Sequence, residues 1–126
     1  MSLSPPILVV EDHDDTRILL VTLLESHGYR TVTARNGAEA LSVGRASGPC
    51  MILLDLMMPV MSGEQFLIAR ESIPALRRVA VAILSASPYA EIVAARYKVD
   101  QCLAKPLDLD RVVSTVERLC RKPQVR

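Results

Sequence analysis

The sequence predicts an α/β fold in which a doubly wound parallel sheet carries helices on both faces. Short runs of apolar and β-branched residues recur along the chain, with the length and composition of strands buried on both sides. Each run is followed by a longer segment with helical caps or periodicity, and this strand–helix order occurs five times. Connections in such folds are short and right-handed, so we expect all strands to lie parallel in one sheet.

The first strand–helix unit begins after two prolines. Residues 7–10 (ILVV) are apolar throughout and are predicted to form a buried strand. In the helix that follows, Asp14 or Asp15 is the expected N-cap, and Gly28 is the expected stop because glycine readily ends helices.

The second and third units follow the same pattern. Residues 29–34 alternate as a half-buried strand does, and Asn36 is the expected cap of a short helix that Gly48 ends. The third strand is residues 51–55 (MILLD), a buried run that finishes on a carboxylate. The helix after it is predicted over residues 63–72.

The fourth and fifth strand–helix units have weaker sequence patterns than the first three. Residues 79–87 are predicted to form a strand and then a turn, followed by a weakly patterned helix over 88–99. Residues 101–106 (QCLAKP) are predicted to form a short last strand. The final helix, over 107–122, is amphipathic and has Asp108 as its expected cap.

Length and composition are those of one globular domain. The chain has 126 residues, of which 50% are hydrophobic and 23% charged. We predict a single domain over residues 1–126, with a core at about 7–120 and flexible ends at 1–5 and 122–126. A net charge of +1 gives no reason to expect nucleic acid or membrane binding. No apolar run approaches the roughly 20 residues of a membrane span, and the start lacks the features of a signal peptide.

The three cysteines indicate a reducing compartment. Cys50, Cys102 and Cys120 are odd in number and widely spaced, unlike the cysteines of small disulfide-rich secreted domains. We therefore predict three reduced thiols in a cytoplasmic protein.

Charged and polar side chains follow the predicted strands at their carboxyl ends. In parallel sheets these ends meet at one edge, where ligands bind. The candidates for a site at this edge are Glu11, Asp12, Asp55, Ser85 and Lys105.

This set of residues is suited to phosphoryl chemistry. Clustered carboxylates repel and raise one another's pKa unless positive charge holds them ionised. Lys105 supplies one charge, and Mg²⁺, which prefers oxygen ligands, would supply more. A hydroxyl and an ammonium beside the metal would clamp a transferring phosphoryl group, and a carboxylate can act as the nucleophile.

Four motifs together resemble a known family. "VVEDHDD", "LLDLMMPVMSG", "ILSAS" and "LAKP", in this order and spacing, are similar to the receiver domains of two-component response regulators. The resemblance covers nearly the whole chain. It implies a flavodoxin-like fold, with a five-stranded parallel sheet in strand order 2-1-3-4-5 and five helices.

The resemblance implies a role for each strand-end residue. Asp55 would accept a phosphoryl group from a histidine kinase or a histidine phosphotransfer protein. Lys105 would pair with Asp55 and then with the phosphoryl group, and Ser85 would hydrogen-bond a phosphoryl oxygen. The implied ligands of the Mg²⁺ ion are Glu11 (through water), Asp12, Asp55 and the backbone carbonyl of Met57.

The resemblance also implies a cis peptide bond before Pro106 and a surface for partner proteins. The Lys105–Pro106 bond is similar to the cis peptide of the family, and the cis form costs little before proline. The expected partner face comprises the fourth helix, the last strand and the last helix, and candidate partners include an output domain and a weak homodimer. Such a domain is not a conventional enzyme, although it catalyses its own phosphorylation and dephosphorylation.

Two departures from the family pattern affect this partner face. Cys102 stands where the family usually has a Tyr or Phe that moves together with the Ser85 position, and a small thiol does not fill that volume. Lys98 and Gln101 stand where glycines are frequent. The usual hydroxyl–aromatic switch is therefore not expected in its ordinary form.

Two alternative functions remain open at this point. "DHDDT" has the spacing of haloacid-dehalogenase-type phosphatases, with Asp12 as nucleophile and Asp14 as acid/base. The phosphatase fold usually needs a longer chain, and the phosphatase hypothesis gives Asp55 no role. The other alternative is a receiver-like binding module that is never phosphorylated. His13, beside the acidic pair, is interpreted as an exposed loop residue.

Overall fold

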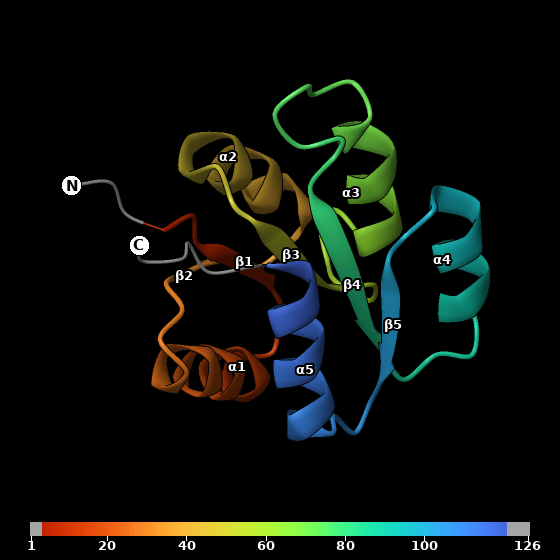
Figure 1. Cartoon of the computed structure of the whole chain (residues 1–126). Helices are drawn as coiled ribbons and strands as arrows, with labels where there is room; N and C mark the ends of the chain where they lie inside the picture. Colours follow the sequence, from red (N-terminus) through yellow and green to blue (C-terminus); the bar gives the residue numbers. More distant parts are fainter. Residues whose placement is uncertain (1–3, 121–126) are drawn as a thin grey trace.

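A computed structural model describes residues 4–120 (Figure 1). Of the ends expected to be flexible, 1–3 and 122–126 lie outside the described residues. Strands and helices alternate along the chain, in the order β1 (Ile7–Val10), α1 (Asp14–Ser26), β2 (Thr31–Ala34), α2 (Gly37–Ser47), β3 (Met51–Asp55), α3 (Gly63–Arg70), β4 (Ala80–Ser85), α4 (Ala90–Tyr97), β5 (Gln101–Ala104) and α5 (Leu109–Leu119).

The strands form one parallel sheet in the order β2-β1-β3-β4-β5, as predicted. Every residue of β1 and β3 is buried, which explains why these two runs carry no alternation of polar and apolar side chains. Because β3 lies at the centre of the sheet, its last residue, Asp55, emerges in the middle of the carboxyl edge.

Two hydrophobic clusters separate the layers of the fold. One cluster joins the sheet to α1 and α5 through residues such as Leu20, Leu24, Val112 and Val116. The other joins the opposite face to α2, α3 and α4, with Phe66 as its largest fully buried side chain. Figure 1 shows the same arrangement, with α1 and α5 together on one side of the sheet. The prediction of helices on both faces is confirmed.

The helix caps agree with the sequence at two of three predicted positions. The side chains of Asn36 and Asp108 accept backbone N–H groups at the starts of α2 and α5, as expected. The prediction that Asp14 or Asp15 caps α1 is wrong. His13 is the N-cap, because its Nδ1 accepts the N–H of Thr16 at 3.4 Å and helical geometry begins one residue later.

Two backbone features follow expectations from the family resemblance. The Lys105–Pro106 peptide is cis. Lys98 ends α4 with φ +55°, in the left-handed region that glycine adopts without cost. A glycine at this position would therefore fit the backbone, and this chain holds the same conformation with lysine.

The prediction of three reduced thiols is wrong for two of them. Cys50 and Cys120 form a disulfide with a Cα–Cα distance of 5.3 Å, whereas Cys102 is free. The two cysteines are 70 residues apart in sequence. They meet because α5 packs under β3, a long-range contact that cysteine spacing does not reveal.

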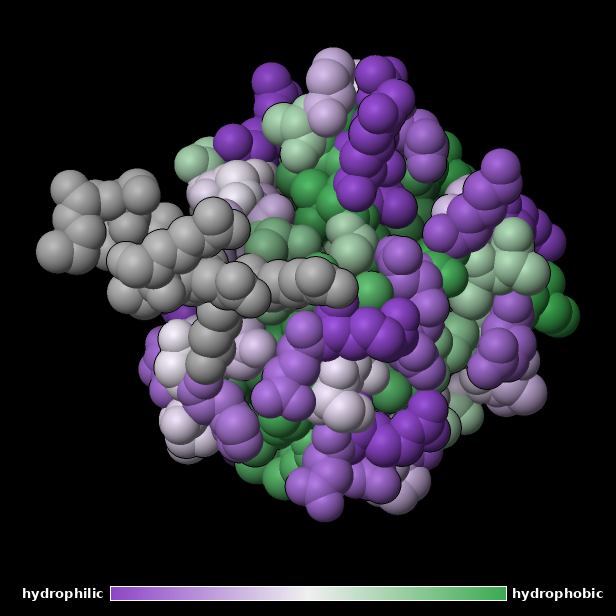
Figure 2. Space-filling model, viewed as in Figure 1, coloured by the Kyte–Doolittle hydropathy of each residue, from purple (hydrophilic) through white to green (hydrophobic). Residues whose placement is uncertain are grey.

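The surface is mixed in character. On the face seen in Figure 2, hydrophilic side chains predominate over α5, and apolar residues show between the elements. Within residues 4–120, no helix is both long and apolar enough to cross a membrane.

Candidate functional site

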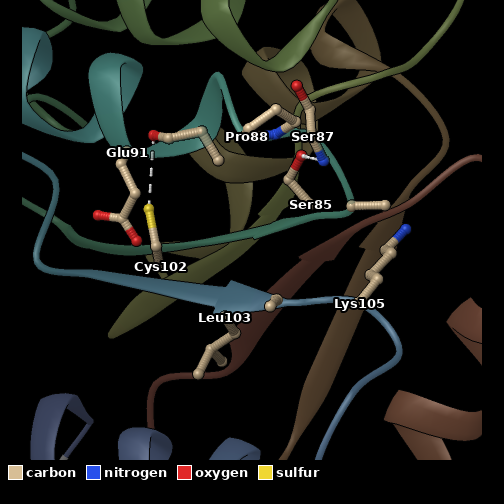
Figure 3. Close-up of a pocket in the computed structure, with 10 residues that line it drawn as sticks. Ser85, Ser87, Pro88, Glu91, Cys102, Leu103 and Lys105 are labelled. Atoms are coloured by element: carbon tan, nitrogen blue, oxygen red, sulfur yellow. Dashed lines mark hydrogen bonds between the residues drawn. The ribbon is translucent and has the colours of Figure 1, made fainter.

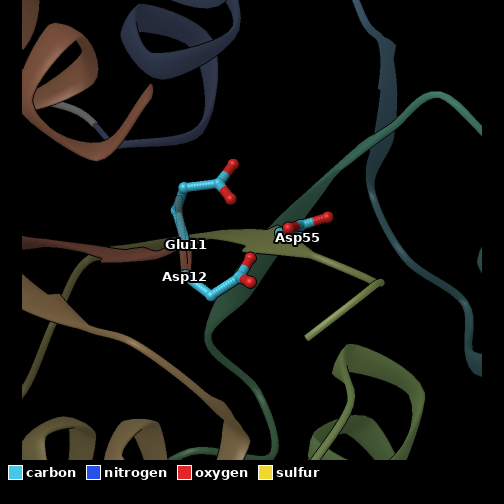
Figure 4. Close-up of side chains that lie close together, drawn as sticks. All are labelled: Glu11, Asp12 and Asp55. Atoms are coloured by element: carbon cyan, nitrogen blue, oxygen red, sulfur yellow. The ribbon is translucent and has the colours of Figure 1, made fainter. Parts of the chain in front are cut away.

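The register of the sheet places the acidic residues side by side. Val10 of β1 pairs with Leu54 of β3, so the residues that come next, Glu11 and Asp55, leave the two strands at neighbouring positions. Asp12 follows directly. Figure 4 shows the three carboxylates gathered where β1 and β3 end. One oxygen from each of Glu11, Asp12 and Asp55 lies within 4.8 Å of the other two.

Burial differs among the three acids. Glu11 is fully buried and Asp55 is 5% exposed, while Asp12 lies at the surface. Backbone donors hold the two buried carboxylates in place: the N–H of His13 reaches Glu11 Oε2 at 3.2 Å, and the N–H of Met57 reaches Asp55 Oδ1 at 3.2 Å. The orientation of both side chains is therefore set by the strand ends themselves.

Lys105 brings the positive charge expected at this edge. It follows β5, and its Nζ lies 2.8 Å from Glu11 Oε1 and 3.7 Å from Asp55 Oδ2. The closer partner is Glu11, so the ammonium group neutralises that carboxylate first and Asp55 to a lesser degree.

The pKa values of the two buried acids are pushed apart. Burial, followed by a hydrogen bond to Glu11 and its negative charge, raises the pKa of Asp55 to about 7. Burial also acts on Glu11, but hydrogen bonds from Lys105, Asp55 and the His13 backbone bring the pKa of Glu11 below its ordinary value. Asp55 is therefore the carboxyl that most needs further positive charge to be ionised at neutral pH.

The donor set fits a hard divalent cation. All three candidate ligands are carboxylates, the chemistry that Mg²⁺ prefers, and no sulfur or imidazole ligand is needed. An added cation would also relieve the raised pKa of Asp55.

An open pocket of about 640 Å³ lies over the acids. Five of the predicted site residues line it: Glu11, Asp12, Asp55, Met57 and Lys105. The rest of the lining is His13, Thr16, Ala86 and Ser87. Ser85 does not line this pocket. Its Oγ accepts the N–H of Ser87 at 3.0 Å, as Figure 3 shows, and its side chain lines a neighbouring cavity.

Comparison with known proteins identifies the family. The sequence profile of the response regulator receiver domain matches residues 7–117. The chain is a member of this family. Transcriptional regulatory protein PrrA of Mycobacterium tuberculosis is 33% identical over 121 residues, which are 94% of this chain and 51% of that protein. The chain thus spans about half the length of that regulator.

Two further comparisons cover nearly whole chains. Sporulation initiation phosphotransferase F of Bacillus subtilis is 30% identical over 114 residues, or 89% of this receiver domain and 90% of that protein. The solved structure of the chemotaxis protein CheY4 of Vibrio cholerae superposes with a TM-score of 0.85 at 25% identity, covering 93% of this chain and 99% of that one. The flavodoxin-like receiver fold is confirmed by sequence and by structure.

Beside the acidic pocket, this receiver domain has a second cavity of about 300 Å³ at Cys102. It is bounded by β5 and the start of α4, and its lining includes Ser85, Cys102 and Lys105 (Figure 3). The Cys102 thiol donates to the carbonyl of Ala90 at 3.5 Å. The expectation that a thiol leaves aromatic volume unfilled at this position agrees with an open space between Ser85 and α4.

Residues of α1 support the receiver site in ways that the sequence did not reveal. Arg17 Nη1 donates to the backbone carbonyl of Glu11 at 3.0 Å, which fixes the end of β1. His13 is exposed, as expected, but it caps α1 and borders the pocket. An arginine four residues after a helix cap carries no motif, so only the packing of α1 against β1 shows this contact.

The raised pKa of Asp55 makes the stability of the metal-free domain depend on pH. In the unfolded chain this carboxyl titrates near 3.8, whereas its folded pKa is about 7. Between these values the folded state binds the extra proton, so the free energy of unfolding falls as pH rises through 7. Glu11, with its lowered pKa, is largely ionised in both states above pH 5 or so and does not oppose this fall.

We expect a loss on the order of 2 kcal/mol between about pH 5 and pH 8, measured by urea unfolding with a chelator present. The matched variant is Asp55→Asn, which cannot titrate and should unfold with little pH dependence over this range. The same slope in both proteins would show that another group is responsible.

Proposed function

We propose that this chain is the phosphoacceptor receiver domain of a two-component phosphorelay, with Asp55 as the phosphorylated residue. The observation that supports it most is the position of Asp55. It lies at the tip of the central strand, at the floor of an open pocket, beside two further carboxylates and 3.7 Å from Lys105. The phosphoryl donor would be a phosphohistidine of a kinase or a phosphotransfer protein. The 30% identity to a Bacillus subtilis phosphotransferase supports transfer of this kind.

In the proposed reaction, a carboxylate oxygen of Asp55 attacks the phosphorus atom of the donor. A P–O bond forms, the P–N bond to the donor histidine breaks, and the nitrogen keeps the electron pair and takes a proton from solvent. Lys105 lies close enough to neutralise charge that develops on the transferred group. The backbone N–H of Met57 donates to Asp55 Oδ1 and so keeps the carboxylate in a fixed orientation.

Glu11, Asp12, Asp55 and the backbone carbonyl of Met57 are the proposed holders of Mg²⁺. When bound, the ion supplies positive charge that keeps Asp55 ionised and offsets the charge of the incoming phosphoryl oxygens. Glu11 contributes mainly by fixing Lys105, since its Oε1 already accepts the ammonium at 2.8 Å.

Signalling is proposed to begin at the turn after β4. The Ser85 hydroxyl now accepts the Ser87 N–H, and it would turn to donate to a phosphoryl oxygen on Asp55. Because Ser85 also borders the cavity at Cys102, such a change would reach the start of α4 and β5. We propose this face as the contact for an output domain or partner, and a cytoplasmic location for the chain.

The phosphatase alternative is disfavoured by membership of the receiver-domain family and by the position of Asp14. Its acid/base residue would be Asp14, but Asp14 forms an ion pair with Arg17 at 2.5 Å on the surface of α1. Asp14 is also absent from the lining of the acidic pocket.

The test is to map phosphorylation directly. The protein is incubated with acetyl phosphate and Mg²⁺, the acyl phosphate is trapped by borohydride, and peptides are sequenced by mass spectrometry. We expect modification at Asp55 that is lost when a chelator replaces Mg²⁺. Modification at Asp12 would instead support the phosphatase reading, and no modification with any donor would support a receiver-like binding module.

A further inference from the structure

Two cysteines far apart in sequence meet at the edge of the sheet opposite the acidic pocket. Cys50 directly precedes β3, and Cys120 directly follows α5. Their Cα atoms are 5.3 Å apart, within the range that a disulfide spans without backbone movement, and the two sulfurs are bonded. The bond therefore ties the start of the central strand to the end of the last helix.

The backbone at each cysteine is held by contacts that do not depend on this bond. The N–H of Cys50 donates to the carbonyl of Pro6 at 2.9 Å, and the N–H of Cys120 donates to Val116 at 2.7 Å. Both side chains also pack in the hydrophobic cluster under the sheet. The fold at this point should therefore persist when the sulfurs are separate.

The thiol form has a hydrogen-bond partner as well. Cys50 Sγ lies 3.5 Å from the carbonyl oxygen of Pro6, so a reduced Cys50 can donate there. Cys120 is 3% exposed and sits among apolar neighbours, where a thiol behaves as a small hydrophobic group. The reduced form therefore has a hydrogen-bond partner at Cys50 and an apolar environment at Cys120.

Access to the pair is asymmetric. Cys50 is partly exposed, whereas Cys120 is buried. A soluble disulfide can therefore react at the Cys50 thiolate first, and Cys120, already in contact with Cys50, can then displace the reagent. In the reverse direction a soluble thiolate attacks the Cys50 sulfur and Cys120 leaves as the thiolate, and a second soluble thiolate then releases Cys50.

We propose that Cys50 and Cys120 are a reversible dithiol–disulfide pair that joins β3 to α5 under oxidising conditions. In the forward direction the Cys50 thiolate attacks a low-molecular-weight disulfide such as oxidised glutathione and releases one glutathione thiolate. The Cys120 thiolate then attacks the Cys50 sulfur of the mixed disulfide and releases the second. Two protein thiols are oxidised, one glutathione disulfide is reduced to two thiols, and the two protons go to the released thiolates.

The consequence is redox control of stability rather than of phosphoryl transfer. The cross-link closes a loop defined by a separation of 70 residues, which removes much freedom from the unfolded chain. We expect the oxidised protein to melt on the order of 10 °C above the reduced protein. Cys50 and Asp55 lie at opposite ends of β3, roughly 17 Å apart for five residues of strand, so the acidic site should be little affected.

The test equilibrates the folded protein in buffers of varied reduced-to-oxidised glutathione ratio, alkylates free thiols, and maps them by mass spectrometry. We expect the Cys50–Cys120 peptide in excess oxidised glutathione, its loss in excess reduced glutathione without unfolding, and Cys102 alkylated throughout. Cys50→Ser should melt like the reduced wild type under both conditions, because serine can still donate to Pro6. Cys102→Ser, the control, should keep the redox-dependent shift in melting temperature.

Three results would overturn the proposal. They are failure of the pair to form in excess oxidised glutathione, a disulfide that resists excess reduced glutathione in the folded protein, and equal melting temperatures for the two states. Acetyl phosphate uptake serves as an independent readout. Uptake that is the same in the oxidised and reduced protein is expected, and a redox-dependent uptake would contradict the separation of the two sites.

Discussion

Replacing Asp55 by Asn is expected to lower phosphoryl uptake from acetyl phosphate by at least about 10³-fold, to below detection in an intact-mass assay. An amide oxygen is not a nucleophile of useful strength at neutral pH, and the neighbouring carboxylates, Glu11 and Asp12, follow β1 and not β3. Asn has nearly the shape of Asp, and its side-chain oxygen can still accept the N–H of Met57, so the site should keep its geometry.

The same substitution should leave the fold at least as stable as the wild type. Burial and the neighbouring Glu11 penalise the charged form of Asp55, as its raised pKa indicates, and a neutral amide avoids this penalty. Loss of uptake together with a retained or raised melting temperature would separate a chemical role from a structural one.

The matched control is Asp15→Asn, which removes an exposed carboxylate from the first turn of α1. It changes the net charge by the same amount and should take up phosphoryl groups like the wild type. Wild-type uptake by Asp55→Asn would refute the assignment of the phosphoacceptor, whereas loss of uptake in both variants would point to a general effect of charge.

The sequence predicted the buried strands and the residues that meet at the carboxyl edge of the sheet, because both depend on local patterns. Uninterrupted apolar runs such as residues 7–10 and 51–55 are typical of strands covered on both faces, and both are fully buried. Once the strands are parallel, residues that follow them share one edge, so the convergence of Glu11, Asp55 and Lys105 could be anticipated.

The features that the sequence missed depend on how distant elements pack. The Cys50–Cys120 bond requires α5 to end beneath the start of β3. The Ser85 hydroxyl accepts a hydrogen bond from the Ser87 backbone, and Ser85 lines the cavity at Cys102 instead of the acidic pocket. The different pKa directions of Glu11 and Asp55 depend on the burial of both carboxyl groups and on the closer approach of Lys105 to Glu11. None of these properties leaves a periodicity or motif in the chain.

The second large effect is expected at Gly63, the first residue of α3. Here the helix starts almost in contact with the end of β3: a Cβ built on Gly63 would lie 2.8 Å from the Cα of Leu56 and even closer to the backbone oxygen of Asp55. Both are backbone atoms of the segment that carries Asp55, the proposed phosphoacceptor, and the N–H of Gly63 donates to the carbonyl of Leu56 at 3.0 Å. A side chain at this position cannot be accommodated by a rotamer change alone.

Gly63→Ala should therefore lower the free energy of unfolding by about 3 kcal/mol or more, measured by urea denaturation. To fold at all, the Gly63→Ala protein must move α3 away from β3 or shift Leu56, and a shift of Leu56 would also move Asp55. Phosphoryl uptake should therefore fall as well. The capping box of Ser62 and Gln65, which begins the same helix, would be displaced together with Gly63.

Gly48→Ala is the matched control for this substitution. Gly48 has φ +59° but no atom within 4 Å of an added Cβ, so alanine there meets strain in the backbone and no steric clash. We expect a cost of about 1 kcal/mol for the left-handed conformation and no change in phosphoryl uptake. If the two variants were equally destabilised, the close approach of α3 to β3 would not be the cause. A larger effect at Gly63, with impaired uptake, would show that this glycine allows the helix to support the loop on which Asp55 and Met57 are placed.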